Sequence, residues 1–198
     1  MDATDSLKNP GLEPAATNIY LVGMPGSGKT ATGKRLAKAT GFAFADLDAR
    51  IAEHAQMPVA ELFARYGEEY FRKLESEQLR QTAGWQRHII ATGGGTPCFL
   101  GNMAWMNRHG LTLFLDVPLD ELVRRLTANA QAQQKRPLFA GKSVDELTES
   151  LSAMLQTRLP FYETACFRLL PHQTDTAKIV SFLKQKAPQL FGREAFRK

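Results

Sequence analysis

Residues 23–30 read Gly-Met-Pro-Gly-Ser-Gly-Lys-Thr, and their types and spacing are suited to holding an anion. They match the pattern G-x-x-x-x-G-K-[ST], follow a short apolar run at 19–22 and precede a helical pattern. Glycines allow backbone angles that are closed to other residues, so several N–H groups can point at one anion. The following helix adds the positive end of its dipole. We therefore predict a binding site for the phosphates of a nucleoside triphosphate.

The loop ends in two residues with separate chemistry, Lys29 and Thr30. A lysine here reaches the outer phosphates, and the threonine hydroxyl is a hard oxygen ligand for Mg²⁺. A glycine-rich turn with a surface lysine is the alternative, which the flanking strand and helix patterns disfavour. The residues predicted to bind ATP phosphates in this loop are Gly26, Ser27, Gly28, Lys29 and Thr30.

Two acidic side chains, Asp46 and Asp48, follow the apolar run at 42–45. In an extended Asp-x-Asp both carboxylates lie on one face, because side chains alternate along a strand. One carboxylate can serve the metal through water, while the other orients an acceptor hydroxyl and takes its proton. The alternative is an aspartate that caps the helix expected from residue 49.

A second glycine cluster, Gly93–Gly95, follows the apolar run at 88–91. Three consecutive glycines cost backbone entropy, which favours a backbone that passes close to a ligand. A flexible turn is the alternative.

Three arginines stand out, because a guanidinium fork suits carboxylates and phosphates. Arg72 and Glu75 lie three apart on a predicted helix and so are neighbours on one face. Arg136 lies in a polar stretch, and Arg158 precedes Leu-Pro-Phe-Tyr. Solvated surface roles are equally consistent with the sequence for Arg124, Arg125 and Lys135.

Composition narrows the class of protein. With 198 residues and 43% hydrophobic content, the chain is long enough for one domain with a proper core. The net charge of +5 is mild, and no basic run carries interleaved aromatics, so we expect no nucleic-acid partner. Two cysteines make no disulfide framework, which favours the cytoplasm. We expect no membrane partner, since no apolar run is long enough to span a membrane. We expect the protein to be a monomer, since no heptad pattern stands out.

Strand and helix patterns alternate along the chain, which predicts an α/β three-layer sandwich with a parallel sheet. Ligands in such sheets bind beyond the carboxyl ends of the strands, so the two glycine clusters and the aspartates should share one edge. Strands are expected at 19–22, 42–45, 88–91, 111–115 and 168–170. Helices are expected at 29–40, 49–56, 58–66, 67–83, 99–108, 119–130, 144–158 (with a bend at Pro160) and 176–186. We predict a loose leader at 1–17, a single domain at 18–186 and a basic tail at 187–198.

Taken together, these motifs resemble the shikimate kinases, which belong to the nucleoside-monophosphate-kinase-like branch of P-loop kinases. The matching segments, in the family's order, are 23–30, 46–48, 67–72 with Glu75, 92–95, 135–138, and Arg158 with Tyr162 and Glu163. They span most of residues 18–170. Thr30 replaces a common serine, and residues 170–174, where the adenine loop should fall, show no residue-by-residue match.

The resemblance implies a five-stranded parallel sheet, a helical substrate-binding segment at about 47–83 and a mobile lid at about 128–143. It also implies transfer of the γ-phosphoryl group of ATP, with Mg²⁺, to the 3-hydroxyl of shikimate in aromatic amino acid biosynthesis. In such a kinase the shikimate carboxylate is held by Arg72, Arg158, Gly94 and Gly95. The other implied roles are Asp48 on the ring hydroxyls, Phe63 and Phe71 as pocket walls, Glu75 orienting Arg72, and Arg136 over the phosphates.

Asp46 is then expected to hold the metal through water, and Lys29, Asp48 and Arg136 to be catalytic. Two rival hypotheses remain: a kinase acting on gluconate, and a non-catalytic nucleotide-binding module.

Overall fold

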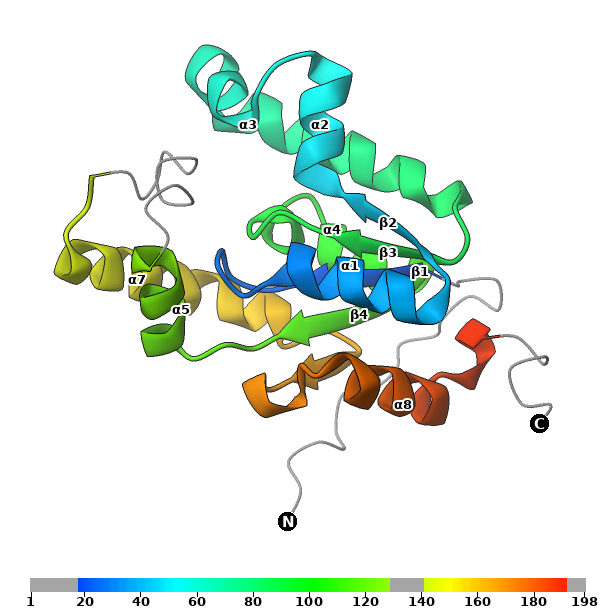
Figure 1. Cartoon of the computed structure of the whole chain (residues 1–198). Helices are drawn as coiled ribbons and strands as arrows, with labels where there is room; N and C mark the ends of the chain where they lie inside the picture. Colours follow the sequence, from blue (N-terminus) through cyan, green and yellow to red (C-terminus); the bar gives the residue numbers. More distant parts are fainter. Residues whose placement is uncertain (1–17, 129–140, 192–198) are drawn as a thin grey trace.

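Five parallel strands form the centre of the structure, in the order β2-β3-β1-β4-β5 (Figure 1). The computed structural model describes residues 18–128 and 141–191. The strands are β1 Asn18–Val22, β2 Ala43–Asp46, β3 His88–Ala91, β4 Gly110–Leu115 and β5 Phe167–Leu169. The predicted five-stranded parallel sheet is confirmed, with strand bounds that differ by at most one residue at either end.

Alternation along β1 divides its side chains between the two faces of the sheet. Ile19 and Leu21 belong to one buried cluster, in which side chains of α1 (Lys29–Thr40) and α8 (Thr176–Lys186) cover the sheet. Tyr20 and Val22 belong to the other cluster, which α4 (Asn102–His109) and α7 (Val144–Tyr162) cover. Buried on both faces, β1 is apolar apart from Asn18, as expected for a parallel sheet. The three-layer arrangement is thereby confirmed.

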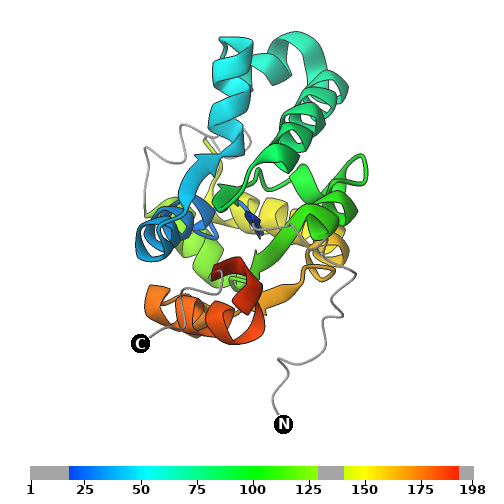
Figure 2. The ribbon, with the colours of Figure 1, turned by 90° about the vertical axis from the view of Figure 1, so that its right-hand side faces the viewer.

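Two helices, α2 (Leu47–Ala55) and α3 (Val59–Arg80), rise from the carboxyl end of β2 and project away from the sheet (Figures 1 and 2). Gly67 interrupts α3 with φ 78° and ψ 174°, at the boundary where the sequence predicted one helix to end and another to begin. A side chain is strained at this positive φ, which glycine tolerates. The projecting pair occupies the range predicted for a helical substrate-binding segment.

Several helix ends differ from the sequence-based expectation. The predicted end of α7 at Arg158 is wrong, because the helix continues through Pro160 to Tyr162. A proline so close to the carboxyl end removes one late hydrogen bond, which the helix tolerates better there than in its middle. α4 starts three residues later than predicted, after a 3₁₀ turn at Thr96–Cys98. α5 covers Leu119–Thr127, and residues 129 and 130 of its predicted range lie outside the described residues.

The start of the predicted basic tail packs against the domain. Pro188–Phe191 form a 3₁₀ turn, and Ala187 and Leu190 are buried. Leu190 adds to the cluster beneath α1 and α8, so residues 187–191 of the predicted tail pack against the domain. Residues 1–17 and 192–198 lie outside the described residues, as does the predicted lid apart from 128 and 141–143. In the described ranges, no helix has the length and apolar character needed to cross a membrane.

Candidate active site

The glycine loop connects β1 to α1 with backbone angles that depend on its glycines. Gly26 and Gly28 have φ 85° and 91°, and Gly28 is the N-cap of α1. Ser27 between them is 3% exposed, and its hydroxyl oxygen has no hydrogen-bond partner among the described residues. A buried hydroxyl without a protein partner is costly unless a ligand bonds to it. The conformation of the loop is therefore compatible with the phosphate-binding role that the sequence predicts for it.

Lys29 extends back over this loop. Its ammonium donates to the carbonyl oxygens of Gly23 at 2.7 Å and Met24 at 2.9 Å, and the residue is 9% exposed. These contacts hold the positive charge against the loop, where it adds to the helix dipole.

Thr30 and Asp46 meet at the amino end of α2. The hydroxyl of Thr30 donates to Asp46 Oδ2 at 2.7 Å, and Asp46 Oδ1 accepts the N–H of Ala49 at 3.3 Å. Asp46 is therefore the helix cap that the sequence left as an alternative, while Asp48 lies in the first turn. A hydroxyl and a carboxylate side by side are hard oxygen donors of the kind that Mg²⁺ binds, so the pair fits the predicted metal.

Asp48 and Glu75 approach each other beside Gly93. A methyl group at position 93 would lie 2.7 Å from Asp48 Oδ1 and 3.0 Å from Glu75 Oε1. Part of Asp48 is exposed, but its carboxyl group is surrounded by protein atoms. This desolvation raises the pKa of Asp48 to about 6, and the like charges of Glu75 and Asp46 add to the shift. Lys29 and Arg72 oppose this shift. A carboxylate with such a pKa is suited to accept a proton near neutral pH.

Arg72 is held rigidly by two carboxylates and a ring. Its guanidinium donates to Glu75 at 2.9 Å and to Glu68 at 3.0 Å, and it lies 4.2 Å from the ring centroid of Phe99. Glu75 is 1% exposed, and its other oxygen accepts the hydroxyl of Thr96 at 2.6 Å. Glu75 thus aims Arg72, because both of its carboxylate oxygens are held.

The triple glycine brings the two arginines together. A methyl group at Gly95 would lie 2.6 Å from Arg72 Nη2, and one at Gly94 would lie 3.0 Å from Arg158 Nη1. The same methyl at Gly94 would lie 3.0 Å from the ring of Pro25, in the phosphate-binding loop. Arg72, Arg158, the triple glycine and the phosphate-binding loop therefore share one edge of the sheet.

The aromatic residues are arranged differently from the prediction. Phe63 and Phe71 pack at 4.3 Å between centroids, but Phe71 is 2% exposed and lies in the core. It therefore supports the pocket more than it lines it. Phe99 has the ring nearest to Arg72, and the sequence offered no signal for it beyond its place after the glycine cluster.

Three further side chains lie beside the site without a role assigned to them from the sequence: Tyr162, named there only within a matching segment, Arg125, whose solvated and functional roles were both left open, and Cys98. The hydroxyl of Tyr162 donates to Gly94 O at 2.6 Å, and Arg125 donates to Ser27 O at 3.3 Å. Burial raises the pKa of Cys98 to about 11 against the opposing charges of Arg158 and Arg72. The spacing of four residues from Arg158 could have identified Tyr162, since such residues share a helix face. Arg136 and Lys135 lie outside the described residues.

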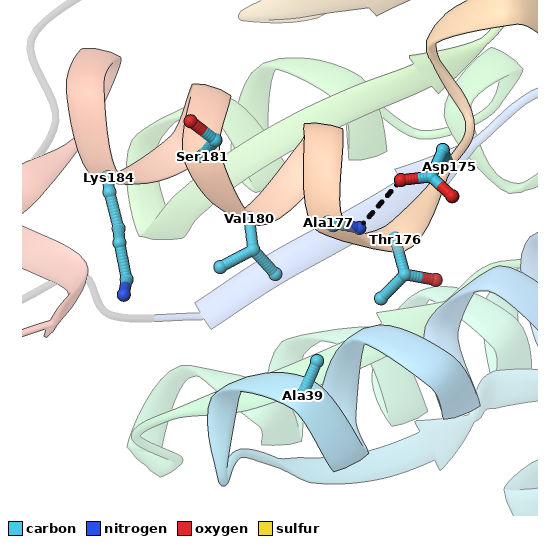
Figure 3. Close-up of a pocket in the computed structure, with 7 residues that line it drawn as sticks. All are labelled: Ala39, Asp175, Thr176, Ala177, Val180, Ser181 and Lys184. Carbon is cyan, nitrogen blue, oxygen red and sulfur yellow. Dashed lines mark hydrogen bonds between the residues drawn. The ribbon is translucent and has the colours of Figure 1, made fainter.

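A shallow groove of about 610 Å³ lies between α1 and α8 (Figure 3). Asp175, one of the polar residues that line this groove, has a structural role. Its carboxylate accepts hydrogen bonds from the backbone N–H groups of Ala177 and Lys178 and so caps α8. None of the predicted site residues lines this groove. The candidate site is therefore the edge of the sheet at which the phosphate-binding loop, the segment with Asp46 and Asp48, and the triple glycine meet.

The first strand of the parallel sheet leads into the glycine loop, and acidic residues and arginines lie beyond the carboxyl ends of the neighbouring strands. This arrangement defines a P-loop kinase of the nucleoside-monophosphate-kinase-like type. The family model for shikimate kinase matches residues 25–187. The chain belongs to the shikimate kinase family, and it is accordingly an ATP-dependent kinase.

Individual relatives support this assignment. A shikimate kinase from Phocaeicola vulgatus is 45% identical over 149 residues, which cover 75% of this chain and 83% of the relative. The crystal structure of shikimate kinase from Bacteroides thetaiotaomicron matches with a TM-score of 0.78 at 38% identity, over 85% of this chain and 97% of that one. Shikimate kinase from Acinetobacter baumannii, solved in complex with shikimate, matches with a TM-score of 0.74 at 28% identity, over 93% and 97%.

Proposed function

We propose that the protein transfers the γ-phosphoryl group of ATP to the 3-hydroxyl of shikimate, giving shikimate 3-phosphate and ADP for aromatic amino acid biosynthesis. One observation carries this proposal: Arg72 and Arg158 adjoin consecutive glycines, and the phosphate-binding loop adjoins one of them through Pro25. Two guanidinium groups suit a small carboxylic acid, and the loop places that acid beside the phosphates.

The phosphate side of the reaction depends on residues 26–30. The N–H groups of Gly26 and Gly28 and the buried hydroxyl of Ser27 hold the outer phosphates together with the ammonium of Lys29, while the N–H of Ser27 donates to Met24 O within the loop at 3.1 Å. As charge develops on the transferred group, these fixed donors stabilise it without reorganising.

Thr30 and Asp46 would hold the magnesium ion, Thr30 directly and Asp46 through a water molecule. Their hydrogen bond of 2.7 Å supports a shared role, since a held carboxylate orients the neighbouring ligand. The ion, when bound, neutralises charge on the β- and γ-phosphates.

On the acceptor side, Asp48 orients the attacking hydroxyl and takes its proton. Its position between Glu75 and the Lys29 charge, with a pKa raised to about 6, leaves it ionised at neutral pH and basic enough to help. Arg72, Arg158 and the backbone of Gly94 and Gly95 hold the carboxylate at the other end of the acid.

Supporting residues complete the pocket. Glu75 orients Arg72, Phe63 forms a wall, and Phe71 packs behind Phe63. The predicted lid arginine, Arg136, would cover the phosphates, where it excludes water that competes as acceptor.

The experiment is a coupled assay of ADP release with shikimate, with gluconate and with no acceptor. We expect release that depends on shikimate alone. Release with gluconate instead would favour the rival kinase, because gluconate also has a carboxylate for the two arginines. No acceptor-dependent release would favour a non-catalytic nucleotide-binding module.

We also propose that the protein acts as a monomer in the cytoplasm, with no nucleic-acid or membrane partner. The mild charge of +5 and the lack of a basic run with aromatics support the part of this proposal that concerns nucleic acid. Light scattering of the purified protein, with and without both substrates, measures its mass directly. A dimeric mass would contradict the proposal.

A further inference from the structure

Tyr162 is a buried side chain that the reaction described above leaves without a role. It lies in the last turn of α7, is 0% exposed, and packs its ring 5.1 Å from that of Phe114. Its hydroxyl donates to Gly94 O at 2.6 Å and lies 3.9 Å from Met24 Sδ. Burial raises the pKa of this phenol, so it remains a hydrogen donor at any physiological pH.

The bond to Gly94 O constrains the next residue as well. The peptide joining Gly94 to Gly95 is trans, so its carbonyl oxygen and the N–H of Gly95 point in opposite directions within one plane. When Tyr162 holds the oxygen, the N–H of Gly95 faces away from α7. Across residues 18–128 and 141–191, no acceptor pairs with this N–H.

The two arginines adjoin this same peptide, Arg158 at Gly94 and Arg72 at Gly95. Arg158 and Tyr162 lie four residues apart on α7 and therefore share one face of it. Two glycines in a row would otherwise let the peptide turn easily, since they carry no side chain to restrict it. The tyrosine hydroxyl therefore holds the oxygen of this peptide, while Thr96 N–H on Gly93 O and Cys98 N–H on Gly95 O hold the peptides on either side.

We propose that Tyr162 is a positioning residue, which orients the Gly94–Gly95 peptide so that the N–H of Gly95 joins Arg72 and Arg158 in binding the substrate carboxylate. This inference rests on the proposed function, because it requires an acidic substrate in the pocket. It assigns to Tyr162 an effect on acid binding and none on the phosphate chemistry.

The test is Tyr162→Phe, which removes the hydroxyl and keeps the ring in the core. We expect the KM for shikimate to rise about five- to twentyfold, since a donor to a charged group is lost from its position. The kcat and the KM for ATP should stay within about twofold, because the phosphate-binding loop keeps its own contacts. With methyl shikimate, whose ester is uncharged, the variant and the wild type should differ by less than about twofold.

Tyr20→Phe is the matched control. Tyr20 is also 0% exposed, and its hydroxyl bonds to Thr82 Oγ1 at 2.8 Å in a structural contact outside the site. Loss of that bond should lower the melting temperature without changing the KM for shikimate. If both variants raised this KM equally, the effect would be a general loss of packing and the inference would be wrong.

A measurement on the wild type covers the case in which Tyr162→Phe fails to fold. The amide proton of Gly95 should move further downfield in NMR spectra with shikimate than with methyl shikimate. An unmoved Gly95 signal, or an unchanged KM in a folded Tyr162→Phe variant, overturns the inference while the proposed function stands. A wild type that releases no ADP with shikimate overturns both.

Discussion

Thr30 and Asp46 lie 16 residues apart in the chain, and a hydrogen bond of 2.7 Å joins the first turn of α1 to the end of β2. Asp46 also caps α2 through the N–H of Ala49. One carboxylate therefore links the phosphate-binding helix to the start of the projecting helical pair. Asparagine caps helices nearly as well as aspartate, so the charge and the cap can be separated experimentally.

We predict that Asp46→Asn raises the Mg²⁺ concentration for half-maximal activity by about tenfold or more, the usual cost of losing a partner of a metal ligand. The melting temperature should change little, because the cap is kept. Titration of activity with Mg²⁺ at fixed ATP measures the first effect. An unchanged requirement for Mg²⁺ would remove Asp46 from the metal site.

Gly95 permits a steric test of the carboxylate site. Its φ of −87° suits any residue, so alanine adds no backbone strain, but the new methyl would lie 2.6 Å from Arg72 Nη2. We predict that Gly95→Ala displaces Arg72 and raises the KM for shikimate at least about tenfold, a loss of about 1.4 kcal/mol.

The control for this variant is Gly84→Ala. A methyl at Gly84 meets nothing within 4 Å, in a 3₁₀ turn at the end of α3. Its steady-state constants should match those of the wild type. Equal effects of the two alanines would mean that the loss comes from a general effect on the protein rather than from contact with Arg72.

The pKa of Asp48 predicts how the protein responds to pH. In the magnesium-free protein, the carboxyl ¹³C signal of Asp48 should titrate with a midpoint of about 6. Below that pH Asp48 is protonated and cannot accept the hydroxyl proton, so activity should fall as the pH drops through this range. Glu75→Gln removes one of the like charges that raise this pKa, so the midpoint should move to lower pH. A midpoint that Glu75→Gln leaves in place would show that the two carboxylates are not coupled.

Arg136 tests the predicted lid. If it lies over the transferred phosphate, Arg136→Ala should reduce kcat by about 10²- to 10³-fold, the effect of losing one transition-state donor, with little change in the KM for shikimate. Arg158→Ala should do the reverse and weaken shikimate binding first. Steady-state kinetics of the two variants, measured side by side, separates the roles. Full turnover in Arg136→Ala would refute the assignment.

The sequence by itself determined the parts of this protein that depend on local backbone demands. The glycines at 23–28 and 93–95 follow apolar strands, so their shared edge could be predicted from the general rule for parallel sheets. Arg72 and Glu75 could be paired from helical spacing alone, and the structure joins them at 2.9 Å.

Only the tertiary structure decided which side chains, distant in the sequence, form hydrogen bonds to the glycine cluster and to the Arg72–Glu75 pair. Thr96 bonds to Glu75 across 21 residues and Tyr162 to Gly94 across 68, and no periodicity relates such positions. The end of α7 at Tyr162 was likewise hidden, because the expected bend at Pro160 did not show how far the helix continues. Such contacts depend on how the helices pack against the sheet, and that packing is a property of the whole fold.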